Sequence, residues 1–134
     1  MENSDDLLFD IFDFSNQVGR GKTLPLLTVD TLHQLGLLPI VDEARLLSFL
    51  EKIQQSYRQD VQYHNDLHGV DVAQMGFYFI KHCQLHEILN LNMLDCLSFI
   101  IAGVCHDVGH DGLTNSYHSN AVTKRAIESN DIAV

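Results

Sequence analysis

The segment Ala102–Asn115, AGVCHDVGHDGLTN, places histidines and an aspartate where an apolar run ends. His106 and Asp107 are adjacent, and His110 follows His106 by four residues. The preceding run, Cys96–Cys105, is long enough for a buried helix, so these side chains should emerge at its end. Imidazole nitrogens and carboxylate oxygens suit zinc, iron, manganese or magnesium. We interpret the segment as half of a metal site, with a buried polar network as the alternative.

A second segment, Tyr63–His68 (YHNDLH), again holds two histidines four residues apart, His64 and His68. Asn65 is a good N-cap residue and predicts a helix over about Asp66–His82. The residues that we expect this helix to turn toward the core are His68, Val72, Met75 and Phe79. The two segments together predict that ligands from two helices share one metal-centred hydrolytic site.

The predicted metal ligands are His68, His106 and Asp107, and a further carboxylate is wanted. Asp131 lies too far from the pattern to be a convincing fourth ligand. Gly69 is a poor helix former, costing about 1 kcal/mol relative to Ala, and is expected where another group approaches the backbone closely.

Other histidines are expected to serve structural or solvated roles. His82 and His86 also stand four apart, but they lie among polar residues at a predicted helix end. His118 is predicted to be a surface residue. None of the three is expected to bind a metal.

Composition limits the classes of partner. The chain has 134 residues, of which 46% are hydrophobic, so it can form one domain or part of a larger one. Its net charge of −10 argues against nucleic acid or an anionic membrane, whereas bound cations would still permit a phosphorylated small molecule. Three cysteines are expected to be reduced, buried thiols. An acidic start and the lack of an apolar run of ~20 residues favour a cytoplasmic location without a membrane span.

The rest of the sequence predicts helices and no convincing strand, so we expect an all-α fold. Residues 1–28 are interpreted as a docking arm, with Phe9, Phe12 and Phe14 on the body, followed by a turn at Asn16–Lys22. In the alternative interpretation, this arm is exposed and binds a partner.

Further helices are expected from the spacing of apolar and capping residues. A short one covers Val29–Leu38, and another runs from the Asp42 N-cap to about Tyr57. Asn92 begins a helix that is apolar all round and should be central and buried. The last helix is predicted over about Asn120–Ser129.

Two longer motifs, YHNDLHGVDV at Tyr63–Val72 and HDVGHDGLTN at His106–Asn115, resemble the catalytic signature of class I 3′,5′-cyclic nucleotide phosphodiesterases. The resemblance extends from about Leu8 to the end of the chain. It implies a multi-helical HD-type metallohydrolase domain. The implied reaction is hydrolysis of the cyclic phosphodiester of cAMP and/or cGMP to the 5′-monophosphate, in cyclic nucleotide signalling.

The resemblance also implies roles for individual residues. His64 would be the general acid that protonates the leaving O3′ atom, and His110 would support the reaction. His68, His106 and Asp107 would bind the tighter of two divalent metals, usually zinc, and Asp107 would also contact a second one, magnesium or manganese. The residues implied to contact the cyclic nucleotide are Tyr63, His64 and Asp107.

Some expectations concern departures from the family pattern. Gly69 stands where Ala is usual, which we regard as minor. A Glu-Asn-His-His segment, a fourth metal-binding Asp and the Gln and Phe that hold the purine do not occur in the 134 residues. We therefore expect the amino-terminal part of a catalytic domain over 1–134, weak or absent activity in isolation, and homodimerisation as a further property. The alternatives are another HD-type nucleotide phosphohydrolase and a truncated, inactive paralogue that binds partners.

Overall fold

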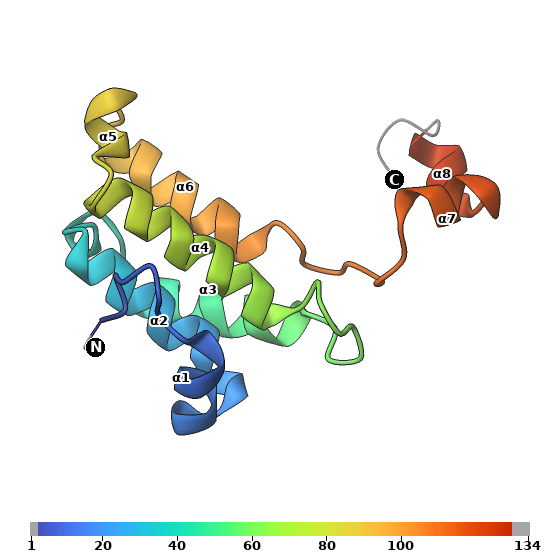
Figure 1. Ribbon diagram of the computed structural model, residues 1–134, viewed down its shortest axis with the longest axis horizontal. Helices are drawn as coiled ribbons and strands as arrows, with labels where there is room; N and C mark the ends of the chain where they lie inside the picture. The colour runs from blue at the N-terminus through green and yellow to red at the C-terminus, as the bar shows by residue number, and fades with distance from the viewer. Residues whose placement is uncertain (1–2, 130–134) are drawn as a thin grey trace.

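The computed structural model describes residues 3–129, and in that range it contains helices and loops but no strand (Figure 1). The longer helices are α1 (Ile11–Val18), α2 (Arg20–Gln34), α3 (Glu43–Ser56), α4 (Asp66–Lys81) and α6 (Met93–Cys105). The shorter ones are η1 (Leu38–Ile40), α5 (Leu85–Ile88), α7 (Asn115–Asn120) and α8 (Lys124–Ser129). The predicted all-α fold is confirmed. No described helix is both long and apolar enough to cross a membrane. Asp131, which was considered as a fourth metal ligand, lies outside the described residues.

Capping side chains fix where three long helices begin. The carboxylate of Asp42 accepts a hydrogen bond from the first turn of α3, and the amide oxygen of Asn65 does the same for α4. Asn92 and Asp95 form a capping box at the start of α6. Such caps typically contribute about 1 kcal/mol each, because they satisfy backbone N–H groups that have no partner within the helix. The predicted starts of these helices are confirmed.

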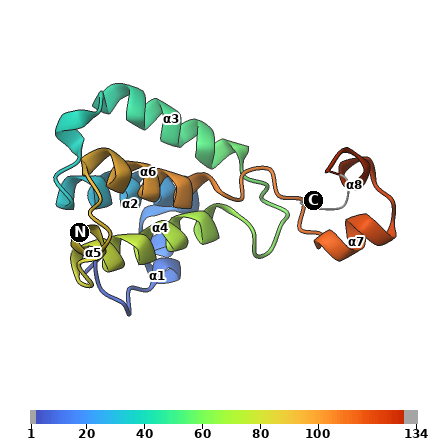
Figure 2. The same cartoon turned by 90° about the horizontal axis from the view of Figure 1, so that it is seen from above.

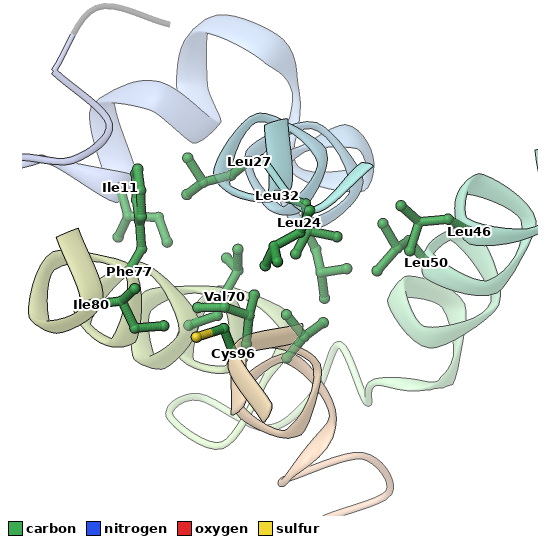
Figure 3. Close-up of a cluster of buried hydrophobic side chains, with 14 of the residues drawn as sticks. Ile11, Leu24, Leu27, Leu32, Leu46, Leu50, Val70, Phe77, Ile80 and Cys96 are labelled. Atoms are coloured by element: carbon green, nitrogen blue, oxygen red, sulfur yellow. The ribbon is translucent and has the colours of Figure 1, made fainter. Parts of the chain in front are cut away.

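The core lies between α2, α3, α4 and α6, with α4 packed against both α2 and α6 (Figures 2 and 3). Its fully buried side chains include Leu24, Leu27, Leu32, Leu50, Val70, Phe77, Ile100 and Val104. Burying an aliphatic or aromatic side chain of this size contributes about 1.5–3 kcal/mol, so apolar burial is the main force that holds α4 beside α6.

The second helix differs from the prediction. Helix α2 begins at Arg20 rather than near Val29, and the expected turn over Asn16–Lys22 is reduced to Gly19, whose φ is +88°. Pro25 lies within α2, where a missing N–H ordinarily destabilises a helix by ~3 kcal/mol. Pro25 is buried among the leucines of this helix, so tertiary packing outweighs that local cost.

The buried faces of α4 and α6 also differ from those predicted. On α4 the buried face contains Val70 and Phe77, whereas Val72 and Phe79 are exposed. His68 therefore lies at the edge of the buried face. Helix α6 is not buried all round, because Phe99 is 43% exposed although its ring lies beside Gly76 of α4.

The two ends of the chain show further differences. Phe9 and Phe14 pack against the core as expected of a docking arm, but Phe12 is exposed. The last helix, predicted over about Asn120–Ser129, begins later, as α8 at Lys124, and the short helix α7 before it was not predicted. Both lie apart from the other helices beyond an extended loop (Figure 1). All three cysteines are free; Cys83 is exposed, contrary to the expectation of buried thiols.

Candidate functional site

The structure brings the three predicted metal ligands together. His68 lies in the first turn of α4, His106 is the C-cap of α6, and Asp107 follows it. One ligand atom from each lies within 4.8 Å of the others. The Oδ2 atom of Asp107 is 3.5 Å from Nε2 of His68 and 3.3 Å from Nε2 of His106. The two segments that carry these residues are therefore one site.

A backbone carbonyl determines which nitrogen of His106 is available. The Nδ1 atom is 2.8 Å from the carbonyl oxygen of Gly103, and a carbonyl can only accept a hydrogen bond. The proton of the neutral ring therefore lies on Nδ1, and the lone pair of Nε2 faces the carboxylate of Asp107. This hydrogen bond to the second nitrogen is the arrangement that orients metal-binding histidines.

One carboxylate oxygen of Asp107 has no hydrogen-bond donor among the described protein groups. This atom, Oδ2, is buried and accepts no hydrogen bond. A buried, unpaired carboxylate oxygen is strongly unfavourable, and a cation between the three residues would satisfy it. Burial lowers the pKa of His68, with the Asp107 carboxylate opposing the shift, and the neutral imidazole favoured by burial is the form that binds metals. The donor set fits a divalent cation such as zinc.

The other predicted site residues lie beside this cluster. The rings of His64 and His110 are stacked, with centroids 4.0 Å apart and planes 21° from parallel. The ring of Tyr63 is 4.6 Å from that of His68 and 5.0 Å from that of His64. Nδ1 of His110 accepts a hydrogen bond from the amide of Gly112, so the proton of the neutral ring is on Nε2. The structure therefore gathers every predicted site residue at the ends of α4 and α6.

One residue at the site was not predicted to belong to it and was named only as the approximate end of the helix that Asp42 begins. Tyr57, the C-cap of α3, is 2% exposed, and its hydroxyl donates a hydrogen bond to the carbonyl of Val104 at 2.8 Å. Burial raises its pKa to about 12, while a hydrogen bond with the backbone of Asp107 opposes the shift. A Cβ atom at Gly69 would lie 2.5 Å from the same hydroxyl oxygen. The close approach expected at Gly69 is thus confirmed, and its partner is Tyr57.

The remaining predictions for histidine concern residues away from the cluster. Nε2 of His82 is 2.9 Å from Oδ2 of Asp5, and Nδ1 of His86 is 3.0 Å from the carbonyl of Ile80. Within residues 3–129, neither belongs to a group of three potential metal donors. Both histidines therefore have the structural contacts that were predicted for them.

The prediction that His118 is a surface residue is wrong, because this side chain is 5% exposed. Its Nε2 atom is 3.1 Å from Oδ2 of Asp111, and its Nδ1 atom is 3.0 Å from the hydroxyl of Thr123. The turn between α7 and α8 covers the ring, which sequence spacing does not reveal. Among the described residues, His118 does not belong to the three-donor cluster.

Comparison with known sequences identifies the family. The sequence profile described as 3′,5′-cyclic nucleotide phosphodiesterase matches residues 63–134, a range that includes all six predicted site residues. The chain belongs to this phosphodiesterase family. The fold and the resemblance predicted from the two histidine motifs are therefore confirmed.

Relatives of this chain have different named substrates. The mouse high affinity cAMP-specific and IBMX-insensitive 3′,5′-cyclic phosphodiesterase 8A is 32% identical over 136 residues, covering 100% of this chain and 16% of the relative. The chimpanzee high affinity cGMP-specific 3′,5′-cyclic phosphodiesterase 9A is 35% identical over 103 residues, covering 75% of this chain and 17% of the relative. The Dictyostelium discoideum 3′,5′-cyclic-nucleotide phosphodiesterase regA is 32% identical, covering 94% and 15%. The chain thus spans about a sixth of the length of these relatives.

Proposed function

We propose that this chain acts in the hydrolysis of the 3′,5′-cyclic phosphodiester of cAMP and/or cGMP to the 5′-monophosphate. The observation that carries the proposal is the convergence of His68, His106 and Asp107 around a buried, unpartnered carboxylate oxygen. The names of the relatives support the substrate class, and they include both a cAMP-specific and a cGMP-specific enzyme. They do not favour one nucleotide over the other.

The three converging side chains are the proposed holders of a divalent cation. His68 and His106 offer Nε2 lone pairs, and Asp107 offers an oxygen that can be shared with a second cation. Zinc suits the mixed nitrogen and oxygen set, and magnesium or manganese suits a position held by carboxylate and water. The chemistry that such a pair supplies when bound is neutralisation of the phosphate charge and acidification of a water molecule.

The proton for the leaving group is assigned to His64. A ribose O3′ atom that leaves as an alkoxide needs a proton, and imidazole is the side chain that exchanges one most readily near neutral pH. The stack of His64 on His110 orients the ring beside the metal ligands, and the amide of Gly112 fixes His110 in turn. Tyr63 lies against His64 and His68, where it would line the substrate pocket.

The test separates cation binding from proton transfer. We expect the 134-residue chain to bind Zn²⁺ and to convert cAMP or cGMP slowly to the 5′-monophosphate with Mn²⁺ or Mg²⁺ present. His64→Ala should retain Zn²⁺ binding but reduce turnover by roughly 10²–10⁴-fold, the usual contribution of a general acid. His86→Ala is the matched control, because His86 is a half-buried histidine away from the site, and it should change neither quantity.

Three results would contradict the proposal. Failure of the wild-type chain to bind Zn²⁺ would remove the metal site, and equal turnover in His64→Ala would remove the proposed acid. Faster hydrolysis of linear than of cyclic phosphate esters would favour another HD-type phosphohydrolase. Homodimerisation and a cytoplasmic location stay predictions.

A further inference from the structure

The hydroxyl of Tyr57 lies where the two ligand-bearing helices meet the site. It donates a hydrogen bond to the carbonyl of Val104, two residues before His106 on α6. It also lies against the backbone of Gly69, the residue that follows His68 on α4. One oxygen atom therefore contacts both helices within two residues of a predicted ligand.

We propose that Tyr57 is a positioning residue that sets the separation of His68 and His106. The inference rests on the proposed function, in which both histidines bind one cation. A tyrosine suits this role because its side chain has few rotatable bonds and its ring is held by the core. The phenol oxygen thus acts as a spacer against α4 and as a hydrogen-bond donor to α6.

The helix crossing itself does not depend on this hydroxyl. Helices α4 and α6 approach closely at Ala73 and Gly103, where a Cβ atom on Gly103 would lie 3.2 Å from the Cα atom of Ala73. The buried side chains of Phe77 and Ile100 extend this packing farther from the site. Tyr57 acts beyond the crossing, at the helix ends that carry the ligands. Loss of its hydroxyl should therefore alter the site more than the core.

Gly69 is the counterpart of Tyr57 in this arrangement. A methyl group at position 69 would meet the hydroxyl oxygen of Tyr57 at 2.5 Å and the carbonyl oxygen of Val104 at 3.0 Å. The first contact is shorter than any normal separation, so Gly69→Ala must displace the ring or the helix. With phenylalanine at position 57 the closest of these contacts is absent. The effects of the two substitutions should therefore be coupled rather than additive.

The experiment measures Zn²⁺ affinity by competition with a chelating dye, together with the visible absorption spectrum of bound Co²⁺. We expect Tyr57→Phe to weaken Zn²⁺ binding by roughly 10–100-fold, as loss of groups that orient ligands usually does, and to change the Co²⁺ spectrum. Gly69→Ala should weaken binding in wild type but have a smaller effect when combined with Tyr57→Phe.

Thr28→Val is the matched control, because it also removes a buried hydroxyl that donates to a backbone carbonyl. Thr28 is 1% exposed and donates to the carbonyl of Leu24 at 2.7 Å, within α2. It should leave Zn²⁺ affinity and the Co²⁺ spectrum unchanged, even where it lowers the melting temperature as much as Tyr57→Phe does.

Each result decides between the two roles of Tyr57. Equal Zn²⁺ affinity in Tyr57→Phe and Thr28→Val would overturn the inference. Loss of the helical circular dichroism signal in Tyr57→Phe would also overturn it, because the hydroxyl would then be needed for the fold rather than for positioning the ligands. Additive effects of Tyr57→Phe and Gly69→Ala would also contradict it. A wild-type chain that binds no Zn²⁺ would instead reject the proposed function.

Discussion

The loop after α6 carries two aspartates, Asp107 and Asp111, and each faces histidine in a different electrostatic setting. Asp107 faces Nε2 atoms of His68 and His106, yet its buried oxygen accepts no hydrogen bond. Nδ1 of His106 donates its proton to the carbonyl of Gly103, so Nε2 of the same ring presents a lone pair to the Asp107 carboxylate. Such a cluster of acceptors is stabilised by a cation.

Asp111, by contrast, is satisfied by protein groups alone. It accepts a hydrogen bond from the amide of Leu113, lies 3.1 Å from Nε2 of His118 and lies 3.2 Å from a guanidinium nitrogen of Arg125. These contacts connect the loop to α7 and α8. The comparison teaches that residue type alone does not distinguish a metal site from a structural one, whereas the supply of donors around the carboxylate does.

The largest expected effect is the loss of Zn²⁺ affinity when Asp107, rather than Asp111, is replaced by asparagine. Asp107→Asn keeps the shape of the side chain but removes its charge, so Zn²⁺ affinity should fall by more than ~100-fold, beyond the usual effect of residues that only orient ligands. Asp111→Asn should change the affinity by less than about twofold, because its partners are protein groups. Isothermal titration with Zn²⁺ measures both, and equal losses would break the comparison.

A somewhat smaller effect is expected on stability when the metal is removed. Zn²⁺ at about 100 times its dissociation constant should stabilise the folded chain by about 2.7 kcal/mol, because it binds the folded state. For a chain of this size, chelation by EDTA should then lower the melting temperature by roughly 10 °C. Differential scanning calorimetry should show this drop in wild type and Asp111→Asn but not in Asp107→Asn. A drop that persists in Asp107→Asn would place the bound metal elsewhere.

The smallest expected effect is the acid sensitivity of the Asp111 cluster. The hydrogen bond from the Leu113 amide lowers the pKa of Asp111 below its usual value of 3.8, and His118 and Arg125 add to the shift. Since the folded-state pKa is depressed, the stabilisation is present above pH ~4 and is lost as the pH falls through the folded-state pKa. Amide hydrogen exchange in α7 and α8 should therefore differ between wild type and Asp111→Asn near neutral pH. A difference unchanged down to pH 2 would contradict this.

Local chemistry explains which helices could be predicted from the sequence. Asp42, Asn65 and Asn92 cap the helices that follow them, and each cap depends only on residues within one turn. The first part of α2 was missed because Gly19 and Pro25 resemble the residues of a loop, and the tertiary burial of the α2 leucines outweighs these local preferences.

The site was predictable in its residues but not in its geometry. Histidine spacing and the family motifs indicated His68 and His106, although the expected inward face of α4 is rotated relative to the observed one. The role of Tyr57 depends on where the end of α3 meets two other helices, which helical periodicity does not specify. Gly69, a poor helix former, was the signal of that contact in the sequence, and a Cβ atom there would lie 2.5 Å from the hydroxyl oxygen of Tyr57.

The position of the site relative to the connection between its two helices has an evolutionary consequence. His68 and His106 lie at one end of the α4–α6 pair, whereas residues 82–92, which include α5, join the helices at the other end (Figure 1). A helix of 16 residues is ~24 Å long, so changes in that connection are remote from the ligands. We expect natural insertions and deletions to accumulate there, leaving chain length free to diverge while the ligand geometry stays constant.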